Sequence, residues 1–226
     1  MSNKILFVTA NFGIYDGIPK CERFDKHDFI MFTDDVKKYE NSRWSIKEFD
    51  QNFHTDEKIN NILKNRYVKF QLHNIMDISQ YGLVVYCDGY MFPKSSEVWL
   101  KYSKFAKKNG IVQQLHTRNI YDECDAIYKC KKDTKENMEN MKNYFKSLNI
   151  PLSIKMYENT AFCYNPLSEN VKNVMNEFWN LYTSLNITYR DQPLWAYIIY
   201  KNNMNPYIIK KLFIQFSKVK VNHKYI

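Results

Sequence analysis

Short apolar runs alternate with longer amphipathic stretches along this chain. Turn residues or charged residues bound the runs, and several runs are rich in β-branched side chains, which is typical of strands. The segment Gly82–Cys87 has no polar alternation, so we expect it to be a central strand that is buried on both faces. The predicted strands cover residues 5–10, 28–33, 44–49, 82–88, 111–115 and 157–164.

The stretches between these runs have helical periodicity. Between Asp56 and about His73 the apolar residues recur at roughly helical spacing, and Arg66 and Lys69 belong to this stretch. Gly110 is expected to end the next helix, because glycine is common just past a helix C-terminus. The predicted helices cover residues 56–73, 95–108, 122–148, 168–182 and 191–200.

The alternation of strands and helices predicts an α/β fold with a mostly parallel central sheet flanked by helices. No internal repeat, linker or low-complexity segment supports a second domain, so we expect one Rossmann-like domain over residues 1–226. Ligands of such sheets bind at the carboxyl ends of the strands. Asn11, Asp34 and Asp88 each follow an apolar strand, so we expect the site at this edge.

Composition and charge narrow the possible partners. The chain has 226 residues, 45% of them hydrophobic, which is enough to bury a core without disulfides. Its net charge of +9 favours anionic partners: nucleic acid, a membrane surface or a phosphorylated small molecule. The lysines are interspersed with acids, as in residues 131–136, which is typical of a solvated helix face.

The sequence gives no sign of export. The apolar run near the N-terminus is too short for a signal peptide, and no window reaches the length of a membrane-spanning helix. The five cysteines are scattered without metal-site spacing, so we expect reduced, buried thiols. A cytoplasmic protein without a membrane span is therefore expected.

Seven short motifs follow one another between the first strand and about residue 200. They are Thr9-Ala-Asn-Phe-Gly-Ile-Tyr-Asp16, Phe32-Thr-Asp-Asp35, Asn65-Arg-Tyr-Val-Lys69 with His73, Tyr86-Cys-Asp-Gly89, His116-Thr-Arg-Asn-Ile-Tyr-Asp-Glu123, Tyr157-Glu-Asn159 and Arg190-Asp-Gln192. In this order the chain resembles the glycosyltransferase-like family that includes plant proteins linked to mucilage polysaccharide and turgor regulation, within the GT-A superfamily. The resemblance implies a GT-A fold and transfer of a sugar from a UDP- or GDP-sugar donor to a glycan or glycoprotein acceptor.

The resemblance also implies a division of the chain. Residues 1–115 would form the part that binds the nucleotide sugar, and residues 116–226 the acceptor side. Thr9, Asn11 and Asp34 would lie near the base and ribose of the donor, while Arg66 and Lys69 would face its phosphates.

Asp88 and Gly89 stand where the superfamily has its Asp-x-Asp motif, which implies a Mn²⁺ or Mg²⁺ ion at Asp88. The second acid is absent, because Tyr90 occupies its position. One carboxylate is a poor site for such an ion unless other groups complete it. His223 is a candidate for that extra ligand, with an exposed tail histidine as the alternative. The alternative for Asp88 is a turn or cap aspartate before the glycine.

The pair Asp191-Gln192 resembles the Asp-Gln motif of glycogenin-like transferases, which retain anomeric configuration. Asp191 would then lie near the anomeric centre, as general base or as electrostatic stabiliser, and Gln192 would touch the donor sugar. A compatible interpretation is that Asp191 caps the helix that follows.

Four more residues are candidates from the resemblance for contacts with sugar or acceptor hydroxyls. The four are His116, Arg118, Glu158 and Asn159. Without the resemblance, His116 and Arg118 would be interpreted as ordinary surface groups.

Two other classes of function remain open from the sequence. One is a non-catalytic protein that binds a nucleotide sugar or a glycan, because the Asp-Gly pair lacks the second acid. The other is a basic nucleic-acid-binding module, although no recognised nucleic-acid motif is present, so we expect no nucleic-acid partner. No P-loop, dinucleotide-binding fingerprint or nucleophile elbow occurs in the chain.

Overall fold

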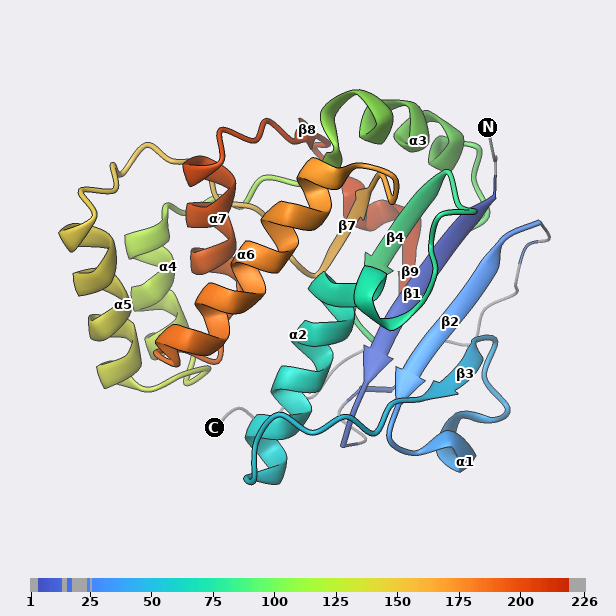
Figure 1. Ribbon diagram of the computed structural model, residues 1–226, viewed down its shortest axis with the longest axis horizontal. Helices are drawn as coiled ribbons and strands as arrows, with labels where there is room; N and C mark the ends of the chain where they lie inside the picture. Colours follow the sequence, from blue (N-terminus) through green and yellow to red (C-terminus); the bar gives the residue numbers. More distant parts are fainter. Residues whose placement is uncertain (1–3, 14–15, 18–23, 25, 220–226) are drawn as a thin grey trace.

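The computed structural model describes residues 4–13, 16, 17, 24 and 26–219. Its main sheet has seven strands in the order β3-β2-β1-β4-β7-β6-β8. They are β1 (Ile5–Asn11), β2 (Asp28–Thr33), β3 (Ser45–Glu48), β4 (Leu83–Cys87), β6 (Ile111–Gln113), β7 (Ala161–Tyr164) and β8 (Tyr207–Ile208). Figure 1 shows β3, β2, β1 and β4 side by side. All neighbours are parallel except β7, which is antiparallel to β4 and to β6. The predicted α/β class with a mostly parallel sheet is confirmed.

Helices flank this sheet, and a small second sheet pairs β5 (Met91–Pro93) with β9 (Phe216–Lys218). The helices are α1 (Val36–Tyr39), α2 (Glu57–Ile75), α3 (Val98–Asn109), α4 (Ile120–Lys129), α5 (Lys135–Ser147), α6 (Glu169–Leu185), α7 (Gln192–Lys201) and the 3-10 helix η1 (Leu212–Gln215). In the described part of the chain, no helix is long and apolar enough to cross a membrane.

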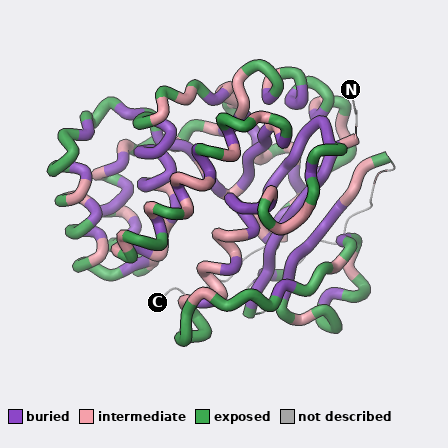
Figure 2. The backbone as a smooth tube through the Cα atoms, viewed as in Figure 1, coloured by how far each residue is buried: buried purple, intermediate pink, exposed green. Residues whose placement is uncertain are grey.

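The sheet is buried on both faces, which explains the continuous apolar runs of β1 and β4. Because side chains alternate along a strand, Leu6 and Val8 pack in one core cluster, while Ile5 and Phe7 pack in the other. The first cluster lies under α2, α6 and α7, and the second lies under α3 and the small sheet. Figure 2 shows β1, β2 and β4 buried along nearly their whole length.

Helix ends follow the sequence signals. The Asp56 side chain accepts a hydrogen bond from Ile59 N (2.9 Å) and so caps α2. Gly110 ends α3 with φ of +79°, and a Cβ there would lie 2.8 Å from Val171 Cγ2. Only glycine fits this position without strain.

Several elements differ from the predictions. The helical stretches expected over residues 122–148 are the two helices α4 and α5, but α4 begins at Ile120 and a turn over residues 130–134 separates the two. The strand expected from Tyr157 begins only at Ala161, and Tyr157 forms an isolated bridge with Leu115. Four described cysteines are free thiols, but Cys130 is exposed rather than buried. Elements such as β8, with two residues, are too short to show a period in the sequence.

The direction of β7 brings distant segments together. Cys87, the last residue of β4, pairs with Ala161, the first residue of β7. The backbone N–H of Asp88 therefore donates to Thr160 O (2.9 Å). Residues just before β7 thus lie at the same edge of the sheet as the carboxyl ends of β1 and β4.

Candidate active site

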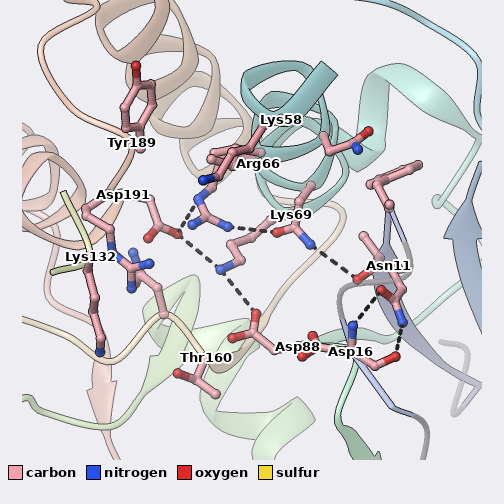
Figure 3. A pocket seen from close by; sticks show the side chains of 18 of the residues that line it. Asn11, Asp16, Lys58, Arg66, Lys69, Asp88, Lys132, Thr160, Tyr189 and Asp191 are labelled. Carbon is pink, nitrogen blue, oxygen red and sulfur yellow. Dashed lines mark hydrogen bonds and ion pairs between the residues drawn. The ribbon is translucent and has the colours of Figure 1, made fainter. Parts of the chain in front are cut away.

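A cavity of about 640 Å³ opens at this edge of the sheet. Its walls come from the end of β1, from α2, from the segments after β4 and before β7, and from the loop that leads into α7 (Figure 3). Its lining is rich in charge of both signs. The cations are Lys58, Arg66, Lys69, Lys132 and Arg190, and the acids are Asp16, Glu57, Asp88 and Asp191.

Lys69 links the two acids that the sequence singled out. Its Nζ lies 3.1 Å from Asp191 Oδ2 and 3.4 Å from Asp88 Oδ1, and only 3% of its side chain is exposed. It also lies over the ring of Tyr86, 4.9 Å from the ring centroid. Arg66, one turn earlier on α2, places its Nε 3.6 Å from the same oxygen of Asp191. The structure therefore brings together four of the predicted residues.

Asp191 is buried and ionised. Burial alone would raise the pKa of its carboxyl, but Arg66, Lys69 and Arg190 outweigh burial and hold the pKa well below its ordinary value. Asp191 stands at the N-cap position of α7, yet its side chain makes no capping hydrogen bond. The interpretation as a side-chain cap is therefore wrong, because the carboxylate is directed to the cations on α2.

Asp16 is a residue of the site that the sequence analysis did not assign. Burial and the neighbouring Asp88 raise the pKa of its carboxyl to about 7. Two hydrogen bonds fix its backbone: Asn11 Nδ2 donates to Asp16 O (2.8 Å), and Asp16 N donates to Asn11 Oδ1 (3.1 Å). Figure 3 shows the Asp16 carboxylate pointing toward Asp88.

Gly89 makes room for this arrangement. A Cβ at this position would lie 3.0 Å from both Cβ and Oδ2 of Asp16. Asp16, from the segment after β1, and Asp88, from the segment after β4, thus both line the cavity. The only sequence signal was that Asp16 closes the first of the seven motifs.

The other residues predicted for the donor lie in different surroundings. Asn11 lines the cavity, whereas Thr9 is fully buried within β1 and is not part of the lining. Asp34 is exposed and accepts a hydrogen bond from Gly13 N (3.1 Å to Oδ2). Contacts of these residues with a base and ribose stay predictions. His223 lies outside the described residues.

A second polar cluster lies beside the cavity. His116 Nε2 lies 3.5 Å from Glu123 Oε2 and 3.8 Å from Glu158 Oε1, and Arg118 Nη1 donates to Glu123 Oε2 (2.7 Å). Burial is the main cause that raises the pKa of the Glu158 carboxyl. Gln192 joins this cluster to the cavity, because its Nε2 lies 3.4 Å from Glu158 Oε2.

Asn159 lies between the two groups and lines the cavity. Only 1% of the residue is exposed, and its Oδ1 accepts a hydrogen bond from Gln113 Nε2 (3.1 Å). Lys132, which the sequence analysis placed on a solvated helix face, lies in the turn between α4 and α5 and lines the cavity. That interpretation of residues 131–136 was wrong for Lys132, because the helical pattern hides the turn.

Solved structures with a similar arrangement of strands and helices include two glycosyltransferases. Mouse xyloside xylosyltransferase 1 is 7% identical, with a TM-score of 0.57 over 92% of this chain and 86% of that chain. The chain has the GT-A fold. The bifunctional glycosyltransferase WbbM is 12% identical, with a TM-score of 0.51 over 94% of this chain but only 39% of the longer protein. No protein-family model and no curated protein sequence matches the chain.

In this GT-A fold the two parts expected from the sequence both contribute to one cavity. Asn11, Lys69 and Asp88 come from residues 1–115, while Asn159 and Asp191 come from residues 116–226. Identities of 7% and 12% establish the fold alone.

Proposed function

We propose that this chain is a glycosyltransferase that moves a sugar from a nucleotide-sugar donor to a glycan or glycoprotein acceptor. The observation that carries the proposal is the contact of Lys69 with both Asp88 and Asp191 in one cavity, at the edge where α/β sheets bind ligands. A diphosphate leaving group gains negative charge as the glycosidic bond breaks. Lys69 and Arg66 are held where such charge can be stabilised without reorganisation.

A divalent ion would add to this stabilisation. No group of three or more acids, histidines or cysteines within the described ranges is placed to hold a metal. Asp16 and Asp88 nevertheless fit an ion such as Mg²⁺ or Mn²⁺, which binds to one or two carboxylates and takes further oxygens from substrate phosphates. Asp16 would replace the second acid of the Asp-x-Asp motif, and no contribution from His223 is needed.

Asp191 would act on the sugar as a fixed negative charge. A carboxyl whose pKa is held far below neutrality is a weak base, so proton abstraction from the acceptor is disfavoured. An ionised carboxylate beside the anomeric carbon stabilises an oxocarbenium-like transition state. This role suits a retaining route, with Gln192 against the donor sugar.

The acceptor would lie on the side of His116, Arg118 and Glu158. The raised pKa of Glu158 brings its carboxyl nearer to the range in which it can take a proton from a hydroxyl group. The same proposal includes the relation to the mucilage-related family and the division of the chain into a donor part and an acceptor part. It also includes a cytoplasmic location and the absence of a nucleic-acid partner.

A thermal-shift screen tests the donor assignment. The full chain is heated with UDP, GDP, CMP and their sugars, with and without Mn²⁺, because a ligand of the folded state raises the melting temperature. We expect one nucleotide to raise it in a Mn²⁺-dependent way, and Asp88→Ala and Asp16→Asn to remove the dependence on Mn²⁺. Asp50→Asn, an exposed acid outside the cavity, is the control.

Three results would change the proposal. A rise in melting temperature that does not depend on Mn²⁺ would show that Lys69 and Arg66 bind the diphosphate without a metal ion at Asp88. Binding without hydrolysis or transfer of the sugar would favour the non-catalytic alternative. No shift with any nucleotide would contradict the proposed function.

A further inference from the structure

The net positive charge of this protein comes from two segments of the chain. Residues 89–121 hold six lysine and arginine residues and one acid, Glu97. Residues 192–226 hold six lysines and no acid. The rest of the chain has slightly more acids than basic residues, so the excess of +9 arises entirely in these two segments.

The fold brings the two segments together. α3 comes from the first segment, and β8, η1 and β9 come from the second. Just before α3, Lys94 Nζ donates to Ile214 O (3.1 Å). In the second half of α3, the Phe105 ring stacks on the Tyr207 ring, with centroids 3.7 Å apart. Both segments pack on the same core cluster, so their exposed side chains lie on one side of the main sheet.

Six exposed lysines on this side form what we call the basic face. The ion pairs that the structure describes all lie outside it. Positive charge that is not neutralised by neighbouring carboxylates attracts anionic partners. The six are Lys101, Lys104, Lys107 and Lys108 on α3, and Lys210 and Lys211 just before η1.

Two apolar side chains are exposed beside these lysines. Leu100, on α3, is 44% exposed, and Ile214, on η1, is 59% exposed. Lys94 binds the backbone of Ile214, and Lys218 Nζ lies 4.8 Å from the centroid of the neighbouring Phe213 ring. The basic face therefore combines positive charge with side chains that gain free energy when they leave water.

These side chains fit a lipid surface better than a nucleic acid. Every cation of the basic face is a lysine, whereas bidentate contacts to bases and phosphates favour arginine. The Phe105 ring is stacked on Tyr207 and lies under Lys101 Nζ, so it is not an open platform for a base. Leu100 and Ile214 match the boundary between lipid headgroups and acyl chains.

We propose that the basic face docks this protein on an anionic lipid surface, with Ile214 and Leu100 entering the headgroup layer. Lysines attract the anionic lipids, and burial of the two apolar side chains adds to this attraction. α3 lies on the surface without inserting, because its apolar side packs in the core through Trp99 and Ala106.

The docked face would lie next to the cavity. Val219 N, just after β9, donates to Tyr90 O (3.1 Å), and Tyr90 lines the cavity. Burial lowers the pKa of Lys218, and the charge of Glu158, on the proposed acceptor side, partly offsets this effect. The docking does not depend on the proposed function, but it would place the acceptor side beside the membrane.

Sedimentation of the full chain with vesicles tests the docking. The probes are vesicles of phosphatidylcholine alone and vesicles that also contain about 30% phosphatidylserine, in about 0.1 M and about 0.5 M salt. We expect binding to the anionic vesicles only. Binding should be weaker at the higher salt concentration, because salt screens the attraction between the lysines and the lipids.

A triple variant removes charge from the basic face. It combines Lys101→Glu, Lys104→Glu and Lys107→Glu. Its partition coefficient should fall about hundredfold or more, because each lysine near an anionic surface contributes roughly fivefold. The control has the same net charge and should keep most of the binding, because its substitutions lie on α4 and α5, away from α3 (Figure 1). It combines Lys129→Glu, Lys135→Glu and Lys146→Glu.

A second pair of variants tests the apolar contact. Ile214→Ser should lower the partition coefficient about threefold or more at the higher salt concentration, where the charges are screened. Leu152→Ser, at a side chain that is 65% exposed after α5, should leave it unchanged. If Ile214→Ser also leaves it unchanged, entry of Ile214 into the headgroup layer is wrong.

The remaining outcomes decide between lipid, net charge and nucleic acid. Equal loss of binding in the two triple variants would show that net charge alone attracts the lipid, and would overturn the proposal. So would failure of the unmodified protein to bind the anionic vesicles. Tighter binding to a DNA duplex of equal charge, lost in the α3 variant, would assign the face to nucleic acid instead. If the α3 variant does not melt cooperatively, Lys210→Glu with Lys211→Glu takes its place.

Discussion

Lys69 Nζ lies 3.1 Å from Asp191 Oδ2, although 122 residues separate the two in the chain. Both side chains are 3% exposed, and Asp88 and Arg66 are the other charged partners of the pair. A buried ion pair of this kind gives little net stability compared with apolar residues, but the loss of one partner leaves an uncompensated charge. Stability alone therefore does not explain the pair, and the proposed function assigns it another role.

Removal of the Lys69 charge should be costly. We expect Lys69→Met to lower the free energy of unfolding by about 3 kcal/mol, and the double variant with Asp191→Asn to recover part of this loss. Urea denaturation of the four members of the cycle measures the coupling. The control is the partly exposed pair Lys4–Asp28 (2.8 Å), where the loss should be below about 1 kcal/mol. Equal losses at the two pairs would contradict the burial argument.

The pH dependence of Asp191 has a defined sign. Its folded pKa lies below the ordinary value of 3.8, so its ionised form contributes stability at all pH values above about 4, and this stability is lost as the pH falls through the folded pKa. The difference in stability between the unmodified protein and Asp191→Asn should therefore be constant from pH 5 to pH 8 and shrink in stronger acid. A difference that changes between pH 5 and pH 8 would show that Asp191 titrates there.

Asp16 should show the opposite dependence. Its pKa rises from 3.8 to about 7 on folding, so the folded state holds the proton more tightly, and stability falls as the pH rises from about 4 to 7. In EDTA, Asp16→Asn should therefore gain stability relative to the unmodified protein between pH 5 and pH 8, by roughly 2.7 kcal/mol, because about two pKa units at about 1.36 kcal/mol each lie between pH 5 and the folded pKa. Urea denaturation at the two pH values measures this gain, and a constant difference would show that Asp16 is not perturbed.

Substitution of two glycines should affect Mn²⁺ binding and stability separately. In Gly89→Ala the new Cβ would displace Asp16, so we expect Mn²⁺ affinity, measured by electron paramagnetic resonance, to fall tenfold or more. Gly110→Ala places a Cβ 2.8 Å from Val171 Cγ2 at a φ of +79°, which should cost about 1–3 kcal/mol of stability without a change in Mn²⁺ affinity. If both variants lost Mn²⁺ equally, local displacement of Asp16 would not be the cause.

Asp133 should position the loop that carries Asp191. Its Oδ2 accepts hydrogen bonds from Thr188 Oγ1 and Tyr189 N, both at 2.8 Å, and Asp133 is 6% exposed. Asp133→Ala should lower stability by about 2 kcal/mol and weaken nucleotide-sugar binding more than nucleotide binding, because the proposed function places the sugar beside Asp191, at the end of this loop. Asp125→Ala, at an exposed ion pair with Lys142, is the matched control. Equal weakening of both ligands would indicate a general structural effect.

The sequence predicted the central layers of the fold better than its edges. The strands β1 and β4 are buried on both faces and so show continuous apolar runs, and α2 has an aspartate cap that can be recognised in the sequence. The two-residue strand β8 has no period to detect, and the antiparallel direction of β7 depends on its neighbours rather than on its own residues. Long, buried elements are thus predictable, while short edge elements depend on tertiary contacts.

The site was predictable where a polar residue follows a strand. Asp88 and Asn11 were found in this way, and Asp191 was found through its motif. The second acid was expected next to Asp88 in the chain, whereas the acid that points toward Asp88 is Asp16, from the segment after β1. Charge pairing between segments far apart in the sequence, such as Lys69 with Asp191, leaves no local pattern.

The antiparallel course of β7 has a consequence for how the molecule would respond to a ligand. It brings the segment before β7 beside the carboxyl ends of β1 and β4, so a molecule that filled the cavity would touch segments from Ala10 to Gln192 at once. Such a molecule would hold together segments that lie far apart in the sequence. It should slow hydrogen exchange in β1, α2 and α7 together, because none of them could open without releasing it.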